Sequence, residues 1–334
     1  MAGRDDTPEL GAAEVVLKAA LRPLGAQVCY GLRLLGRSGR ALPKLAPALL
    51  IVLALFAWNT RAPYWAVPAL PGTNRIERTA PDFHSLRLFL RSPVAVAVRL
   101  VLDEAASPLP SPRMVWTLLL FARAPSPVEM QRPSDFFKML PAAGVEVLVG
   151  AVVFALLLVL LADRLSGGGP KGRIRQRFRA ILPPVLALTA LLSALFLLIS
   201  YLSVYVWQGR GTHLWWLLSA AKALLLPAPY LIAARGLGLW RAIAQGLGIL
   251  RRRIVAVLVV LLLAGVMLVA EREVGGAIAR NLFWDARFRF AVQALWMAVL
   301  ALLTCVRAIT SVWVAGAYMM LAVDEGPAPE AGGA

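Results

Sequence analysis

Long apolar runs alternate with short polar stretches along most of this chain. Six such runs cover residues 45–58, 142–162, 180–207, 214–234, 254–270 and 290–310. A bilayer core about 30 Å thick is crossed by roughly 20 helical residues, and every run except the first approaches or exceeds that length. The pattern therefore predicts an all-α polytopic membrane protein with six transmembrane helices.

The first run is the shortest of the six. Residues 41–43 can extend it, and Lys44 can keep its charge at the surface by snorkelling. A cleaved signal peptide is disfavoured, because 44 residues precede the run and no small-x-small motif follows it. We therefore expect residues 45–59 to form an uncleaved first span.

Basic residues concentrate in two connections between predicted spans, residues 163–179 and 235–253. Short loops rich in Lys and Arg stay in the cytoplasm, because these residues near span ends resist translocation. The expected anchors of this orientation are Arg173, Arg175, Arg177, Arg179, Arg251, Arg252 and Arg253. With six spans, both termini are then cytoplasmic.

The first 44 residues precede the first span and carry an amphipathic pattern. Their apolar stripe consists of Leu17, Leu21, Leu24, Val28, Leu32 and Leu35. These spacings of three and four residues predict a helix, which Pro23 should kink or restart. Basic residues beside the stripe indicate an interfacial "elbow" helix on the inner leaflet. The alternative is a helix packed against the cytoplasmic face of the protein itself.

Residues 60–141 form the longest stretch without a predicted span, and prolines recur throughout it. We expect a Pro-rich extracytoplasmic region of short elements, which is a possible docking site for a protein partner. Residues 142–323 should form a five-span helical bundle. Residues 324–334 are acidic and rich in Gly, Pro and Ala, and this composition predicts a disordered tail.

The composition supports a membrane location. The chain has 334 residues, of which 60% are hydrophobic, and a net charge of +17. Because the basic residues flank apolar runs, we expect them to contact anionic lipid headgroups and not nucleic acid. Arg far outnumbers Lys and Ala is abundant, as in bacteria with GC-rich genomes, so we expect a bacterial inner membrane. The two cysteines and two histidines show no metal-binding spacing, and no cofactor is expected.

Two polar residues inside predicted spans are candidate functional groups, since polar groups in a bilayer are costly unless partnered. Lys222 and Glu146 both lie toward the outer ends of their spans. We hypothesise that they pair inside the bundle or share an outer vestibule. The alternative is that Lys222 snorkels alone to the outer headgroups.

Arg307 lies near the end of the last predicted span, residues 290–310. We expect its long side chain to snorkel to the inner leaflet.

A resemblance to a known family rests on residues 224–262. Leu-Leu-Leu-Pro-Ala-Pro-Tyr ends at Tyr230, Arg-Gly-Leu-Gly-Leu-Trp-Arg-Ala-Ile begins at Arg235, and Gly-Leu-Gly-Ile-Leu-Arg-Arg-Arg begins at Gly246. This segment resembles the six-span membrane domain found attached to bacterial glycerophosphodiester phosphodiesterases and its uncharacterised stand-alone relatives. The resemblance implies cytoplasmic termini. The phosphodiesterase activity cannot be carried over, because the resemblance covers only the membrane domain. Residues 60–141 are longer than the family pattern implies.

Three functional classes follow from these features. A non-catalytic accessory or assembly subunit fits best, because no Ser-His-Asp, Cys-His or paired-carboxylate arrangement can be proposed from the sequence. A transport component for a lipid or small solute would use the region around Lys222 and Glu146. A lipid-acting membrane enzyme would need titratable residues that converge at one interface.

Overall fold

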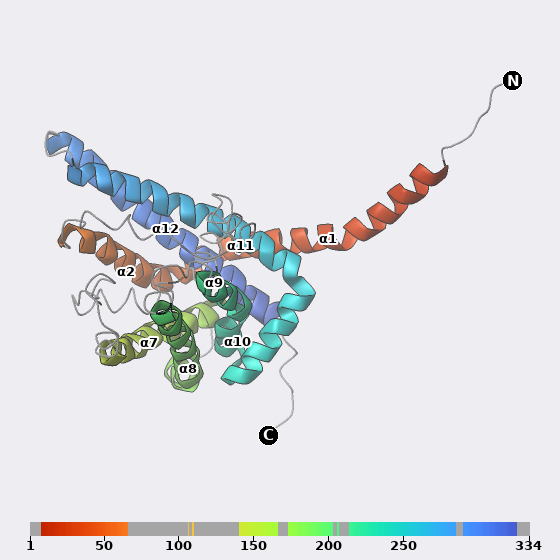
Figure 1. Ribbon diagram of the computed structural model, residues 1–334, viewed down its shortest axis with the longest axis horizontal. Helices are drawn as coiled ribbons and strands as arrows, with labels where there is room; N and C mark the ends of the chain where they lie inside the picture. Colours follow the sequence, from red (N-terminus) through yellow and green to blue (C-terminus); the bar gives the residue numbers. More distant parts are fainter. Residues whose placement is uncertain are drawn as a thin grey trace.

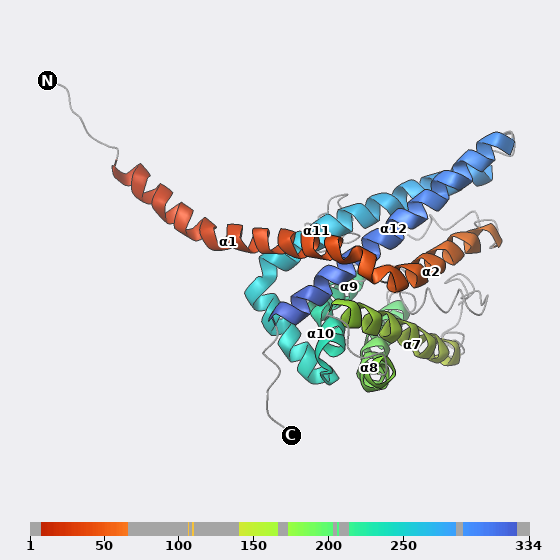
Figure 2. The same cartoon turned by 180° about the vertical axis from the view of Figure 1, so that it is seen from behind.

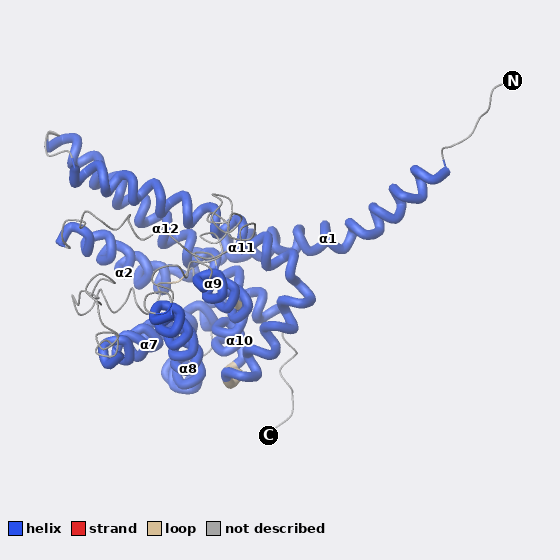
Figure 3. Tube along the Cα trace, in the orientation of Figure 1, coloured by secondary structure: helices blue, strands red, loops and turns tan. Residues whose placement is uncertain are grey.

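The computed structural model describes the backbone of residues 8–65, 140–165, 173–202, 214–284 and 290–325, together with Ala106, Leu109 and Val206. Helices account for nearly all of these residues, and no strand occurs among them (Figure 3). The all-α class is therefore confirmed for the described part of the chain. The remaining residues, including most of 60–141 and the segment 326–334, lie outside the described part, as do the side chains at several helix ends.

The helices follow one another in the order shown in Figure 1. Their bounds are α1 (Pro8–Ala41), the 3-10 helix η1 (Leu42–Leu45), α2 (Ala46–Trp65), α7 (Leu140–Leu165), α8 (Arg173–Tyr201), α9 (Leu214–Leu225), α10 (Pro227–Arg235), α11 (Leu239–Trp284) and α12 (Phe290–Glu325). Helix α1 continues through Pro23, and the next prolines, Pro43 and Pro47, stand where η1 and α2 begin. Proline is tolerated in a first helical turn, because its missing N–H has no helical partner there.

Five helical segments among the described residues are long and apolar enough to cross a membrane. They are Pro23–Ala57, Val147–Leu165, Ile174–Ile199, Leu214–Arg235 and Ala301–Glu325. A multi-pass membrane protein is therefore supported. The sixth expected span, residues 254–270, lies within α11 but is not among the five. The last candidate segment extends to Glu325, so residues 311–323, for which the sequence allowed either a continued helix or a turn along the inner surface, continue the helix.

The first candidate span is longer than the apolar run that predicted it. Helices α1, η1 and α2 follow one another without a loop, so the segment from Pro23 to Ala57 forms one continuous helical rod. The rod runs antiparallel to α12: Tyr30 contacts Asp324, Ser38 contacts Trp313, and Arg307 contacts Phe56 further along.

Helix α12 lies at the centre of the bundle, in contact with α1, α2, α7, α10 and α11 (Figure 2). Nearly every side chain between Ala308 and Ala322 is buried. Small residues make this possible, because a Cβ atom at Gly316 would overlap the hydroxyl of Ser38. Two hydrogen bonds join the helices at the same place. The Ser38 hydroxyl donates to the Trp313 carbonyl, and the Trp313 indole N–H donates to the Leu35 carbonyl at 2.7 Å.

Helix α11 bends sharply at Arg253, whose backbone (φ −125°, ψ 27°) is not helical. The part before Arg253 packs against α10, and the part after it lies beside α12 (Figure 1). The turn between α10 and α11 depends on Gly236, which adopts a left-handed conformation (φ 66°) and donates to the Ile232 carbonyl at 2.8 Å. Glycine is the residue most easily placed in this conformation.

Candidate functional site

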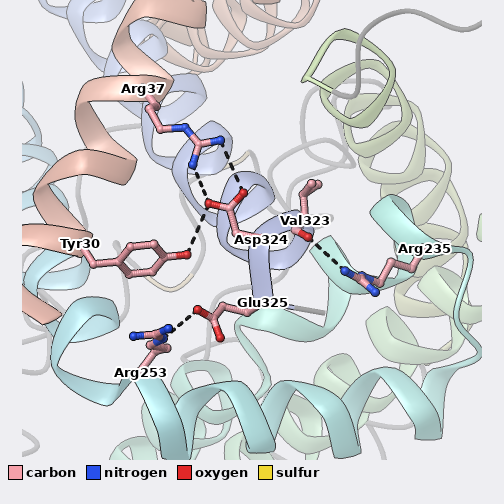
Figure 4. Close-up of polar contacts among 7 residues, drawn as sticks. All are labelled: Tyr30, Arg37, Arg235, Arg253, Val323, Asp324 and Glu325. Atoms are coloured by element: carbon pink, nitrogen blue, oxygen red, sulfur yellow. Dashed lines mark hydrogen bonds and ion pairs between the residues drawn. The ribbon is translucent and has the colours of Figure 1, made fainter. Parts of the chain in front are cut away.

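The C-terminal end of α12 is held by side chains from three other segments of the chain (Figure 4). Asp324 and Glu325, which the sequence assigned to a disordered tail, form the last residues of this helix. We call the group of side chains that meets there the C-terminal clamp. It consists of Tyr30, Arg37, Arg235, Arg253, Asp324 and Glu325.

Helix α1 supplies the contacts to Asp324. Arg37 donates from Nη1 to Oδ2 at 2.6 Å and from Nη2 to Oδ1 at 3.4 Å, so the pair is bidentate. The Tyr30 hydroxyl lies 3.4 Å from the same Oδ2 atom. Tyr30 and Arg37 are seven residues apart, which is about two helical turns, so both side chains leave α1 on one face.

Arg253 connects the bend of α11 to the end of α12. Its Nε atom donates to Oε1 of Glu325 at 2.7 Å. Its guanidinium also lies 5.0 Å from the centre of the Tyr30 ring, within the range of a cation–π interaction. One arginine therefore ties α1, α11 and α12 together at the point where α11 changes direction.

Arg235 bonds to the backbone of α12. It is the last residue of α10 and donates to the carbonyls of Ala322 at 3.3 Å and Val323 at 3.0 Å. The last four carbonyls of a helix have no partner within the helix, and the C-terminus carries partial negative charge. Arg235 therefore satisfies two of these groups and complements the dipole of α12.

The clamp is partly open to solvent. The Arg37 and Asp324 side chains are 52% and 25% exposed, whereas Glu325 is only 13% exposed. Exposed ion pairs contribute about 0–1 kcal/mol each, so the pair of Arg37 with Asp324 adds little to the free energy of unfolding. The geometry of the clamp instead fixes how the ends of α1, α10, α11 and α12 are placed relative to one another.

Only one of the expected topology anchors belongs to the clamp, namely Arg253. Arg251 and Arg252 are exposed, and Arg252 donates back to the Gly248 carbonyl at 3.3 Å. In α8, Arg175 and Arg179 are exposed. Arg177 approaches Asp163 of α7, and the side chain of Arg173 lies outside the described residues. The sidedness of these residues in a membrane stays a prediction.

The contact between Arg177 and Asp163 joins the ends of α7 and α8. Nη1 of Arg177 lies 3.8 Å from Oδ1 of Asp163, which is an ion-pair distance but too long for a hydrogen bond. The carboxylate side chain is only 10% exposed. The first turns of α8 therefore supply a positive charge to a nearly buried acid at the end of α7.

The proposed partners Lys222 and Glu146 are not brought together by any described contact. Lys222 is half-buried in the last turn of α9, whereas Glu146 belongs to α7 with a side chain outside the described residues. Their pairing stays a prediction.

Arg307 has an aromatic neighbour. Its guanidinium lies 5.0 Å from the centre of the Phe56 ring in α2. Arg307 is 18 residues before Glu325, which corresponds to about 27 Å along the helix. Arg307 therefore lies near the opposite end of the candidate span from the clamp. The expected contact with the inner leaflet stays a prediction.

The sequence did not single out most of the clamp. Tyr30, Arg37 and Arg235 looked like ordinary residues of basic helices, and the two acids looked like the start of a tail. One available signal was the position of Asp324 and Glu325 directly after an apolar run, at the end expected to be surrounded by arginines. Carboxylates in such a position gain from basic neighbours.

The chain matches no protein-family model, no curated protein and no solved structure. The resemblance of residues 224–262 to a bacterial membrane domain therefore stays an expectation.

Proposed function

We propose that this chain is a six-span protein of a bacterial inner membrane that serves as a non-catalytic accessory or assembly subunit for a membrane partner. The observation that carries the proposal is the C-terminal clamp. Its charged side chains bond to one another and to helix carbonyls across four helices. Ionic groups used in this way define one arrangement of helices, which is the property that a scaffold needs.

The sixth span in this proposal is the part of α11 after Arg253. It carries the buried residues Val257, Val260, Leu261, Ala264 and Leu268 and the exposed residues Leu258, Leu262, Leu263, Val266 and Met267. One face thus packs on the bundle while the other presents large apolar side chains outward. An apolar exposed face suits contact with lipid chains.

Affinity purification in a mild detergent from native membranes, with quantitative mass spectrometry, tests the accessory role. We expect one partner at near-stoichiometric yield, compared with an unrelated multi-pass protein purified in parallel. In a variant with residues 66–100 replaced by a Gly/Ser linker, the partner should be lost. This replacement keeps Ala106 and Leu109, which pack with the core. Recovery of the chain without any stoichiometric protein would contradict the proposal.

A second candidate is a transport component, which the half-buried Lys222 within the candidate span Leu214–Arg235 favours. Ionisable residues inside spans mark many transport pathways. Purified protein in liposomes with fluorescent phosphatidylglycerol tests this candidate. Transport through this region would appear as lipid flux that falls about tenfold or more in Lys222→Met but not in the control Lys44→Met.

A further inference from the structure

The first part of α11 differs in direction from the rest of the bundle. Before the bend at Arg253, it runs at a steep angle to the part after the bend and lies near the end where α12 terminates (Figure 1). The ion pair between Arg253 and Glu325 holds the bend against that end of α12. A helix placed across the ends of spans lies along a membrane surface when the spans cross the bilayer.

One face of this helix is buried against the rest of the protein. Ala242, Gly246 and Ile249 are spaced by four and three residues and are buried. A Cβ atom at Gly246 would lie 3.5 Å from the Cβ atom of Pro227 in α10, so the two helices approach closely there. This contact determines which side chains point away from the bundle.

The opposite face is exposed and combines aromatic, apolar and basic side chains. Trp240, Leu247 and Arg251, spaced by seven and four residues, form its centre. Trp240 is 74% exposed and Leu247 is 43% exposed. Arg241 and Arg252, also exposed, lie along one flank, while the half-buried Ile243 and Leu250 lie along the other.

This arrangement matches the physical requirements of the boundary between headgroups and acyl chains. Tryptophan is enriched at membrane interfaces because its ring is apolar and its N–H is polar. Interfacial helices combine Lys and Arg with Trp or Leu, and long arginine side chains can reach the headgroups while their stems lie along apolar surface. Guanidinium groups also bind phosphate oxygens with good geometry. An exposed tryptophan beside three arginines therefore has a suitable ligand in an anionic phospholipid.

We infer that the exposed face of α11 formed by Trp240, Arg241, Leu247, Arg251 and Arg252 binds anionic phospholipid headgroups of the leaflet beside the C-terminal clamp. Trp240 and Leu247 enter the boundary region, and the three arginines contact the lipid phosphates. This inference goes beyond the proposed function, because it depends only on membrane embedding and holds with or without a protein partner.

Fluorescence quenching by brominated lipids tests the inference on the full-length protein in nanodiscs. The discs contain equal amounts of phosphatidylcholine and phosphatidylglycerol, with bromine on the chains of one lipid or the other. The chain has ten tryptophans, so the signal of Trp240 is the difference between the native protein and Trp240→Phe. We expect brominated phosphatidylglycerol to quench Trp240 about twofold more than brominated phosphatidylcholine.

Two charge variants supply the matched comparison. Replacing Arg241, Arg251 and Arg252 with glutamine should abolish the preference for the anionic lipid. Replacing Arg33, Arg40 and Arg164 with glutamine removes the same amount of charge from exposed positions on α1 and α7. This control should leave the preference for the anionic lipid intact. Thermal unfolding of each variant verifies that the bundle is folded.

Three results would overturn the inference. The first is equal quenching of Trp240 by both lipids. The second is quenching that does not change in Trp240→Phe, since Trp240 would then lie away from lipid. The third is loss of Trp240 quenching in the presence of a co-purified protein or at a higher protein-to-lipid ratio. This result would assign the exposed face to protein contact.

Discussion

Gly31 shows how one missing side chain sets a distance between helices. It lies in α1 directly against α11, and a Cβ atom there would be 2.8 Å from the carbonyl oxygen of Ala256 and 3.3 Å from its Cα. Backbone atoms cannot move aside as the end of a flexible side chain can. Five residues later, Gly36 is exposed and has nothing within 4 Å of its Cβ position.

These two glycines make a matched pair for substitution. Gly31→Ala should lower stability by about 1–3 kcal/mol, because the added methyl group forces α1 and α11 apart. Gly36→Ala should raise stability by about 0.5–1 kcal/mol, because alanine favours the helical conformation. Denaturant unfolding in detergent micelles measures both. Equal effects from the two substitutions would mean that α1 does not pack on α11 as described.

The ion pair of Arg37 with Asp324 is suited to a double-mutant cycle. Because both side chains are partly exposed, we expect a coupling energy of only about 0.2–1 kcal/mol between Arg37→Gln and Asp324→Asn, which decreases at high salt. Arg33→Gln, one turn earlier and exposed, should show no coupling with Asp324→Asn. A coupling of similar size at both positions would indicate a general charge effect and not a specific contact.

At the scale of elements, the docking of α12 on the rod formed by α1, η1 and α2 depends on small residues. Gly316 faces Ser38, and a Cβ atom there would also lie 3.3 Å from Cδ1 of Leu45. The Ser38 hydroxyl is occupied in a hydrogen bond to the Trp313 carbonyl. Steric fit and hydrogen bonding thus coincide at one crossing of the helices.

This crossing predicts a specific rescue. Gly316→Ala should destabilise the bundle by about 1–3 kcal/mol, since the new methyl group overlaps the Ser38 hydroxyl. Ser38→Ala alone should cost about 1 kcal/mol through the lost hydrogen bond. In the double variant, however, the methyl group at residue 316 faces a Cβ atom 3.6 Å away. We therefore expect the double variant to be more stable than the sum of the two single effects predicts.

Unfolding of all four proteins in the same detergent measures this non-additivity. Strictly additive effects would contradict the described contact between Ser38 and Gly316, because residues that share no contact generally contribute independently.

At the scale of the whole molecule, charged side chains lie at two levels along the contact between α12 and the rod formed by α1, η1 and α2. The clamp gathers three arginines and two carboxylates at one end. Further along, Arg307 lies over Phe56. If the spans cross the bilayer, the clamp and the basic connections before α8 and α11 share the cytoplasmic side under the positive-inside rule.

Cysteine labelling on intact cells tests this orientation and the sixth span together. In a chain carrying Cys29→Ser and Cys305→Ser, we expect a membrane-impermeant maleimide to label Asp285→Cys from outside. Gly168→Cys should react only after permeabilisation. Outside labelling of Gly168→Cys alone would invert the topology. Protection of both positions in intact cells would show that α11 does not cross the membrane.

The sequence alone determined the helical, multi-pass character of this protein. Apolar runs such as residues 180–207 predict a span by local composition, because a bilayer requires a continuous length of apolar helix wherever the rest of the chain lies. Basic composition likewise marked the connections 163–179 and 235–253, but it did not predict the bend of α11 at Arg253. The apolar run 45–58 is shorter than the candidate span Pro23–Ala57, because the helix continues through residues 41–46.

The tertiary structure alone decided which polar residues meet. Tyr30 and Asp324 are 294 residues apart, and no local pattern encodes their contact. Asp324 and Glu325 read as a disordered tail because their composition is polar. Their order comes from arginines on α1, α10 and α11, which gather only when the helices pack. Charges act over a few ångströms in space regardless of separation along the chain, so the fold has to exist before such a cluster can form.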